Sequence, residues 1–247
     1  MAASGSELRL GRRYRGPPGT ANGGYACGML AAVVGGGAAE ATLRRPLPLE
    51  RPLGVRRDGD RVLVADGEGI LLAEAGPAAD VELTAPSVMA EEALAVAGRS
   101  RYYDDPVFPG CFVCGPARPP GDGLGVFPGP LPGRAVWAAP WAPHPSVADA
   151  DGAVRPEVLW AALDCPSGIA AAEAAGLPDG TAVVLGRMAA TLAARPRAGT
   201  PCRVVAWPGR VEGRKLAAAS ALVGPGGEVL AAARTLWLTV VRPPGPA

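Results

Sequence analysis

The feature of this sequence that most constrains its fold is a repeat inside the chain. The Ala-Thr-Leu triplet that begins at Ala41 recurs at Ala190, and in both copies a proline follows nine residues after the leucine. Further along, Gly69–Ala75 resembles Gly227–Ala233. Two similar units in one chain predict a fold that other proteins build from two copies of one subunit, with a site between the halves.

Each copy of the repeat follows a stretch that is typical of a helix. Asn22 is a good N-cap for a helix that runs to Val34, where three glycines end it. Pro156 suits the first turn of a second helix that runs to Ala174. A connecting helix is predicted over 86–97 and a long loop over 106–132. The segments predicted as strands are 7–14, 40–43, 53–57, 61–65 and 70–75, then 134–139, 182–194, 200–207, 215–223 and 228–240.

Composition excludes several classes of protein. The net charge is +1, and no basic run is interleaved with aromatic residues, so we expect no nucleic-acid partner. No run of 18 apolar residues occurs, and residues 1–10 lack the pattern of a secretory signal, so we expect no membrane partner. Five cysteines, an odd number, suit a reducing compartment, so we expect a cytoplasmic protein.

Four short motifs resemble the double-hotdog acyl-CoA thioesterases. Asn22-Gly23-Gly24-Tyr25 is similar to the start of the first hotdog helix, and the stretch 42–46 to the strand that follows it. The motif at 111–115, Cys-Phe-Val-Cys-Gly, is similar to the opening of many hotdog thioesterase-like proteins. The stretch 160–164 resembles the second hotdog helix with its acidic residue, and the likeness covers most of residues 14–240.

The resemblance implies an α+β fold of two tandem hotdog units, each an antiparallel sheet wrapped around a central helix. We expect an N-terminal unit over 1–80, a helical linker over 81–106 and a C-terminal unit over 107–247. The implied function is hydrolysis of an acyl thioester carried on coenzyme A or a carrier protein. A thioester dehydratase or lyase and a non-catalytic acyl-thioester-binding protein remain alternatives. No cofactor is expected, and double-hotdog chains of this kind can form homo-oligomers.

Asp164 is the first candidate catalytic residue, because it lies in an otherwise apolar helical stretch where a carboxylate costs free energy unless it is paired or faces a wet site. It could act as a general base, as a nucleophile, or simply as a polar residue that fixes the helix. Asn22, Gly23 and Gly24 are the candidate substrate-binding residues. Free backbone N–H groups at a helix start can stabilise an oxyanion, although glycines there can also serve close packing.

Thr191 is the second candidate catalytic residue, since it lies on the strand after the second helix and could bind water or substrate. Threonine is also a routine strand residue. Some double-hotdog thioesterases complete an Asp–Thr–Gln set, and this chain contains no glutamine, so that set cannot be complete here.

The cysteines give weaker indications. Cys111 and Cys114 have the spacing of half a zinc site, but zinc usually takes four ligands, and no second paired spacing occurs. Spacing therefore predicts no metal. Cys165 and Ser167 are candidate nucleophiles without an evident base, and His144, the only histidine, lies between two prolines.

Overall fold

The computed structural model describes residues 6–82 and 84–240. Its strands are β1 (Ser6–Arg9), β2 (Ala39–Leu43), β3 (Pro52–Asp58), β4 (Arg61–Ala65), β5 (Leu71–Pro77), β6 (Gly129–Pro130), β7 (Trp137–Trp141), β8 (Ala182–Leu192), β9 (Cys202–Glu212), β10 (Lys215–Val223) and β11 (Val229–Val240). Its helices are α1 (Gly23–Val34), α2 (Ala90–Val96) and α3 (Pro156–Ala174), with short 3-10 turns η1 (Arg12–Tyr14), η2 (Arg101–Tyr103) and η3 (Pro145–Val147).

The strands form one antiparallel sheet in the order β1-β3-β4-β5-β2-β8-β11-β10-β9-β7-β6. The two halves of the chain meet where β2 pairs with β8. In this pairing Glu40 is opposite Ala189, and these positions are 149 residues apart, the same spacing that separates Ala41 from Ala190. The β2–β8 pairing thus joins the two halves into one sheet, and the fold class is the predicted α+β double hotdog.

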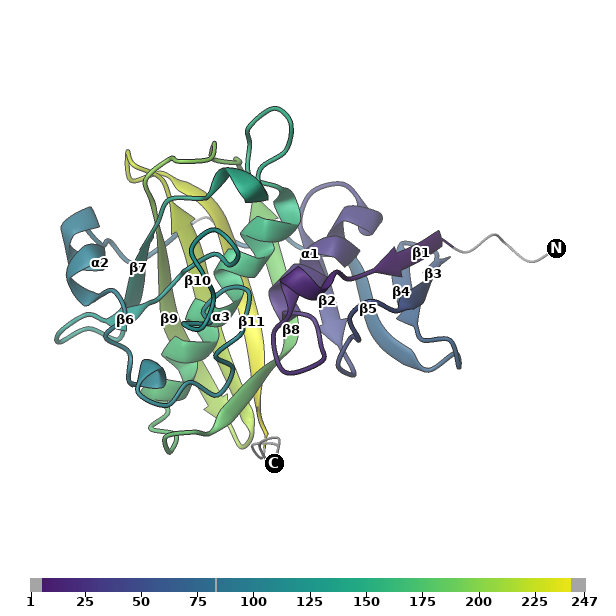
Figure 1. Ribbon diagram of the computed structural model, residues 1–247, viewed down its shortest axis with the longest axis horizontal. Helices are drawn as coiled ribbons and strands as arrows, with labels where there is room; N and C mark the ends of the chain where they lie inside the picture. The colour runs from purple at the N-terminus through teal and green to yellow at the C-terminus, as the bar shows by residue number, and fades with distance from the viewer. Residues whose placement is uncertain (1–5, 83, 241–247) are drawn as a thin grey trace.

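The two long helices lie side by side on one face of the sheet. Figure 1 shows α3 crossing the strands β7–β11, with α1 beside it next to the strands of the N-terminal half. The main hydrophobic core lies between these helices and the sheet, and it includes Leu30, Phe112, Leu163 and Met188. Both central helices therefore contribute buried residues to this core.

A second, smaller core lies on the opposite face of the C-terminal strands. It is built from Val81, Val88 and Val96, from the linker and α2, against the alternate residues of β7–β11 such as Ala189 and Val205. The helix of this linker is shorter than the predicted 86–97. It begins at Ala90, where the Glu92 side chain accepts a hydrogen bond of 2.7 Å from the Met89 N–H.

The first predicted strand, over 7–14, is longer than the one that forms. β1 ends at Arg9, which lies opposite Pro52 at the start of β3. Proline has no N–H to extend the ladder, and the chain turns into η1 instead. No helix in the described ranges is long and apolar enough to cross a membrane.

Candidate functional site

Asp164 lies midway along α3, and its side chain is only 1% exposed. The neighbouring helix α1 approaches it so closely that a Cβ on Gly24 would stand 2.4 Å from the Asp164 Cβ and 2.7 Å from the Trp160 carbonyl oxygen. Only glycine allows this approach. The glycine start of α1 is therefore what brings the buried carboxylate against a helix N-terminus.

The carboxylate is held by the first turn of α1. Its Oδ2 accepts hydrogen bonds from Asn22 Nδ2 at 2.7 Å and from the Gly24 N–H at 2.9 Å. Asn22 Oδ1 accepts from the Tyr25 N–H at 2.9 Å, so Asn22 caps the helix as expected and also orients Asp164. Among the described residues no group bonds to the buried Oδ1 of Asp164, so this oxygen is an acceptor without a protein partner.

Burial raises the pKa of the Asp164 carboxyl to about 7, and the proximity of Cys111 adds to the rise. The hydrogen bonds from Gly24 and Asn22 act in the opposite direction, since they favour the ionised form. A carboxyl with a pKa near neutrality can both accept and release a proton in the pH range where general acid–base catalysis operates.

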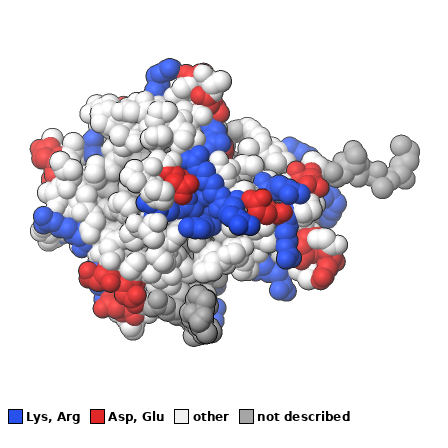
Figure 2. Space-filling model, viewed as in Figure 1, with Lys and Arg blue, Asp and Glu red and all other residues white. Residues whose placement is uncertain are grey.

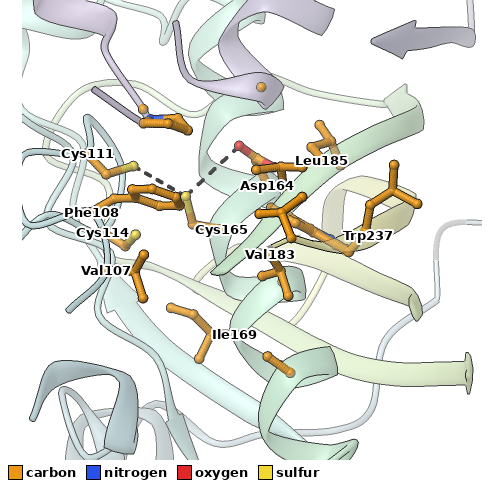
Figure 3. Close-up of a pocket in the computed structure, with 18 of the residues that line it drawn as sticks. Val107, Phe108, Cys111, Cys114, Asp164, Cys165, Ile169, Val183, Leu185 and Trp237 are labelled. Atoms are coloured by element: carbon orange, nitrogen blue, oxygen red, sulfur yellow. Dashed lines mark hydrogen bonds between the residues drawn. The ribbon is translucent and has the colours of Figure 1, made fainter. Parts of the chain in front are cut away.

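A cavity of about 950 Å³ opens beside Asp164. Figure 3 shows Asp164, Cys165 and Cys111 at one part of its wall and the apolar side chains of Val107, Phe108, Ile169, Val183 and Trp237 around the rest. The cavity is thus mainly apolar, with a polar wall where α1 and α3 meet, which is the usual character of a site for a small organic ligand.

Of the predicted substrate-binding residues, Asn22 and Gly23 line this cavity. The Gly24 N–H is bonded to Asp164, so it is not free for a substrate oxygen. For the Gly23 N–H, which lies at the first position of α1, the described residues give no acceptor. The one helix-start donor left for a ligand is therefore at Gly23, while Gly24 positions the carboxylate.

The structure does not bring Thr191 to Asp164. Strand alternation directs Ala190 into the main core and Ala189 into the outer core, so Thr191 shares the outer face of β8. There its hydroxyl accepts a hydrogen bond of 2.8 Å from the Val81 N–H, and Thr191 is not among the cavity residues. The observed contact of the Thr191 hydroxyl is thus with Val81, in the segment predicted as the linker. Ser167 is also occupied, since its hydroxyl donates to the Asp164 carbonyl at 2.7 Å.

Three cysteines that the sequence separates lie together in the cavity wall. The sulfur atoms of Cys111, Cys114 and Cys165 are all within 4.8 Å of one another. Sequence reasoning missed this group because Cys165 is 54 residues from Cys111 and belongs to no paired spacing. The cavity is also lined by Arg45, an exposed arginine at the end of β2.

Positive side chains gather on one face of the molecule, as Figure 2 shows, over the region where η1 and the loop after η2 lie. In this region arginine side chains donate hydrogen bonds to backbone carbonyls of the loop. Arg13 donates to the carbonyls of Gly121 and Asp122, and Arg15 donates to that of Gly110 at 2.8 Å. These arginines hold the loop that carries Cys111 and Cys114 against the N-terminal segment.

Comparison with known proteins shows the fold. No family model matches the chain, and no curated protein matches it in sequence. Among solved structures, an acyl-CoA thioesterase II from Mycobacterium marinum superposes with a TM-score of 0.58 at 17% identity, covering 97% of this chain and 94% of that one. A protein from Novosphingobium aromaticivorans with a provisional thioesterase assignment gives 0.59 at 15% identity, covering 95% of both chains.

A third structure is described by its fold alone. It is a protein of unknown function with a hot dog fold from Alicyclobacillus acidocaldarius, with a TM-score of 0.51 at 13% identity over 95% of this chain and 92% of that one. These likenesses extend over nearly the whole chain. The chain is therefore a double-hotdog protein.

Proposed function

We propose that this protein hydrolyses an acyl thioester. The observation that carries the proposal is the arrangement at the α1–α3 contact. A buried carboxylate, Asp164, keeps one oxygen without a partner among the described residues and lines a largely apolar cavity beside the helix start at Gly23. The full-length likeness to solved structures that include a named acyl-CoA thioesterase supports the same substrate class.

In the proposed reaction Asp164 acts on the attacking water. Its Oδ2 is fixed by Asn22 and Gly24, which leaves Oδ1 to accept a proton as the water oxygen attacks the thioester carbonyl carbon. The carbon–sulfur bond then breaks, and the proton passes from Asp164 to the departing thiolate. Direct attack by the carboxylate, followed by hydrolysis of the resulting anhydride, gives the same products and needs the same residue.

The carbonyl oxygen of the substrate becomes negative during either reaction, and the N–H of Gly23 is the donor that would stabilise it. This group sits at the positive end of the α1 dipole. Leu185 packs closely against this position, since a Cβ on Gly23 would stand 2.9 Å from the Leu185 Cβ, so only glycine fits here.

The other parts of the substrate would contact different parts of the cavity wall. The acyl group would pack against apolar residues such as Ile169, Val183 and Trp237. Arg45, which lines the cavity and is exposed, suits the phosphates of coenzyme A. We therefore propose acyl-CoA as the first substrate class to test, with an acyl carrier protein as the other.

The direct test incubates the purified protein with acyl-CoAs of increasing chain length and follows release of free thiol, with Asp164→Asn beside the wild type. We expect turnover of at least one chain length, and a loss of about 100-fold or more in kcat for Asp164→Asn, since a general base is worth that much. Unchanged melting and circular dichroism of the variant would exclude unfolding as the cause.

One observation favours a second candidate, a protein that binds acyl thioesters without turning them over. Thr191 lies on the outer face of β8 and the chain has no glutamine, so Asp164 lacks the partners that complete some related sites. Tight binding of acyl-CoA by a folded wild-type protein, with no thiol release from any member of the panel, would overturn hydrolysis and support this alternative.

A further inference from the structure

The loop before β6 makes a tight turn that begins at Cys111. The turn is closed by the Gly115 N–H, which donates to the Cys111 carbonyl at 3.0 Å. A Cβ on Gly115 would stand 2.5 Å from that same carbonyl oxygen, so the tight turn requires glycine. The turn keeps the sulfur of Cys114 close to that of Cys111, and cysteine sulfur is a metal ligand in its thiolate form.

The fold adds a third sulfur from a different element. Cys165, on α3, lies 3.5 Å from Cys111 through their Sγ atoms, and Cys114 completes a group whose sulfurs all lie within 4.8 Å of one another. Three cysteines from two separate segments thus converge on one point of the cavity wall.

The separation between the sulfurs of Cys111 and Cys165 is closer to that of two metal ligands than to that of a disulfide. Zinc binds thiolate sulfur at about 2.3 Å, which places tetrahedral ligand sulfurs about 3.8 Å apart. The observed Sγ–Sγ distance of 3.5 Å between Cys111 and Cys165 is within a few tenths of an ångström of this value. A disulfide needs about 2.05 Å, so the same two atoms would have to approach by roughly 1.5 Å.

We propose that Cys111, Cys114 and Cys165 form a binding site for a thiophilic divalent cation, with Zn²⁺ as the natural candidate. Three thiolates leave one coordination position, and all three residues line the cavity, so the fourth ligand is a water or a bound molecule. Asn22 Nδ2, at 3.6 Å from Cys165 Sγ and 3.9 Å from Cys111 Sγ, supplies the outer hydrogen bonds that such sites use.

This site would tie the loop that carries Cys111 to helix α3 and would set a metal beside the cavity. It does not depend on the proposed hydrolysis, because its evidence is the sulfur geometry alone. The spacing of Cys111 and Cys114 in the sequence indicates two sulfur ligands. The third, Cys165, is brought to them by the packing of α3 against the loop.

The test is titration of the reduced, metal-free protein with Co²⁺, followed by displacement with Zn²⁺. We expect one equivalent of Co²⁺ to give sulfur-to-metal charge-transfer absorbance, and Zn²⁺ to abolish it. Cys111→Ser and Cys165→Ser should each weaken binding by at least about 100-fold, because even outer-shell partners are worth 10- to 100-fold. Cys202→Ala, a buried cysteine on β9 outside the group, is the matched control and should bind like the wild type.

Three results would overturn the site. They are no charge-transfer absorbance from the reduced wild type, equal binding by folded Cys165→Ser, and a Cys111–Cys165 disulfide as the only cysteine chemistry that mass spectrometry detects. Cys165 is partly exposed to the cavity, so Cys165→Ser decides the question if Cys111→Ser fails to fold. Native mass spectrometry gives a second readout, with one Zn²⁺ bound to the wild type and none to that variant.

Discussion

The two ends of the α1–α3 contact look alike in backbone geometry and differ in their chemistry. At one end Gly24 of α1 touches Asp164, and at the other Gly28 touches Glu157, so the helices run antiparallel and each end pairs a glycine with an acidic residue. Asp164 lines the cavity and meets N–H donors. Glu157 is not among the cavity residues. Close helix packing is thus common to both ends, and a candidate site occurs at one.

The charge environment explains the difference. Glu157 lies 3.6 Å from the Nε of Arg155, whose Nη2 donates to the Tyr14 hydroxyl at 3.0 Å. A guanidinium therefore compensates this carboxylate, and Tyr14 stacks on Tyr25 beside it. For Asp164 no ion pair occurs among the described residues; its donors are the amide of Asn22, the backbone N–H of Gly24 and, at 4.0 Å, the thiol of Cys165. Asp164, a buried carboxylate with a raised pKa in a cavity wall, is therefore the stronger candidate for a base than Glu157.

The largest effect we expect is on catalysis, and it should occur at one end alone. Asp164→Asn should lower kcat for acyl-CoA hydrolysis by about 100- to 10,000-fold. Glu157→Gln, the matched change at the other end, should leave kcat within about twofold because its carboxylate does not face the cavity. Steady-state thiol release measures both. Equal losses in the two variants would contradict the asymmetry.

The next effect is on stability, and it should be equal at the two ends. Gly24→Ala and Gly28→Ala should each lower the free energy of unfolding by roughly 1–3 kcal/mol, since the new Cβ would meet the backbone of α3 at 2.7 Å and 2.6 Å. Urea denaturation measures this. Gly37→Ala, where nothing lies within 4 Å of the added Cβ, is the control. A neutral result at either end would mean that the helices pack less closely than described.

A smaller effect tests whether Thr191 belongs to the site. Thr191→Val leaves the Val81 N–H without its partner and should cost about 1 kcal/mol of folding free energy. Activity should stay within about twofold, because the hydroxyl lies on the outer face of β8 and away from the cavity. Thr191→Ser, which keeps the hydroxyl, should recover the stability. A large fall in kcat with unchanged folding would restore Thr191 as a catalytic candidate.

The smallest effect that we expect is on the KM for acyl-CoA, through contacts with the phosphates of coenzyme A. Arg45→Ala should raise the KM for acyl-CoA by about 3- to 5-fold, as expected for an exposed charge that contacts phosphate. Arg51→Ala, also exposed but not a cavity residue, should leave it unchanged. Acyl thioesters of N-acetylcysteamine, which lack the phosphates, should show no difference between Arg45→Ala and the wild type. If Arg45→Ala also raised the KM for these short thioesters, Arg45 would have a role other than contact with the phosphates.

Local signals in the sequence predicted the central helices well. The Asn22 cap and the glycines after Val34 bound α1, and Pro156 opens α3. Strand ends were predicted less well, because they depend on the partner strand. β1 stops at Arg9 since Pro52 opposite it has no N–H, and no pattern within 7–14 indicates that.

The candidate site was partly predictable. The sequence indicates Asp164 and the helix start at residues 22–24 as separate candidates, and the structure places Asp164 in contact with Asn22 and Gly24. The side of β8 that Thr191 occupies depends on which face of the sheet the helices cover, and the grouping of Cys165 with Cys111 depends on tertiary packing. Neither can be read from spacing along the chain.

The most direct test of the central claim is a crystal structure with a non-hydrolysable acyl-CoA in which a methylene group replaces the thioester sulfur. The account predicts that the ketone oxygen lies within hydrogen-bond distance of the Gly23 N–H, with Asp164 beside the carbonyl carbon and the acyl chain against Ile169 and Trp237. A ligand bound at the Gly28–Glu157 end, or one whose carbonyl lies away from Asp164, would contradict it.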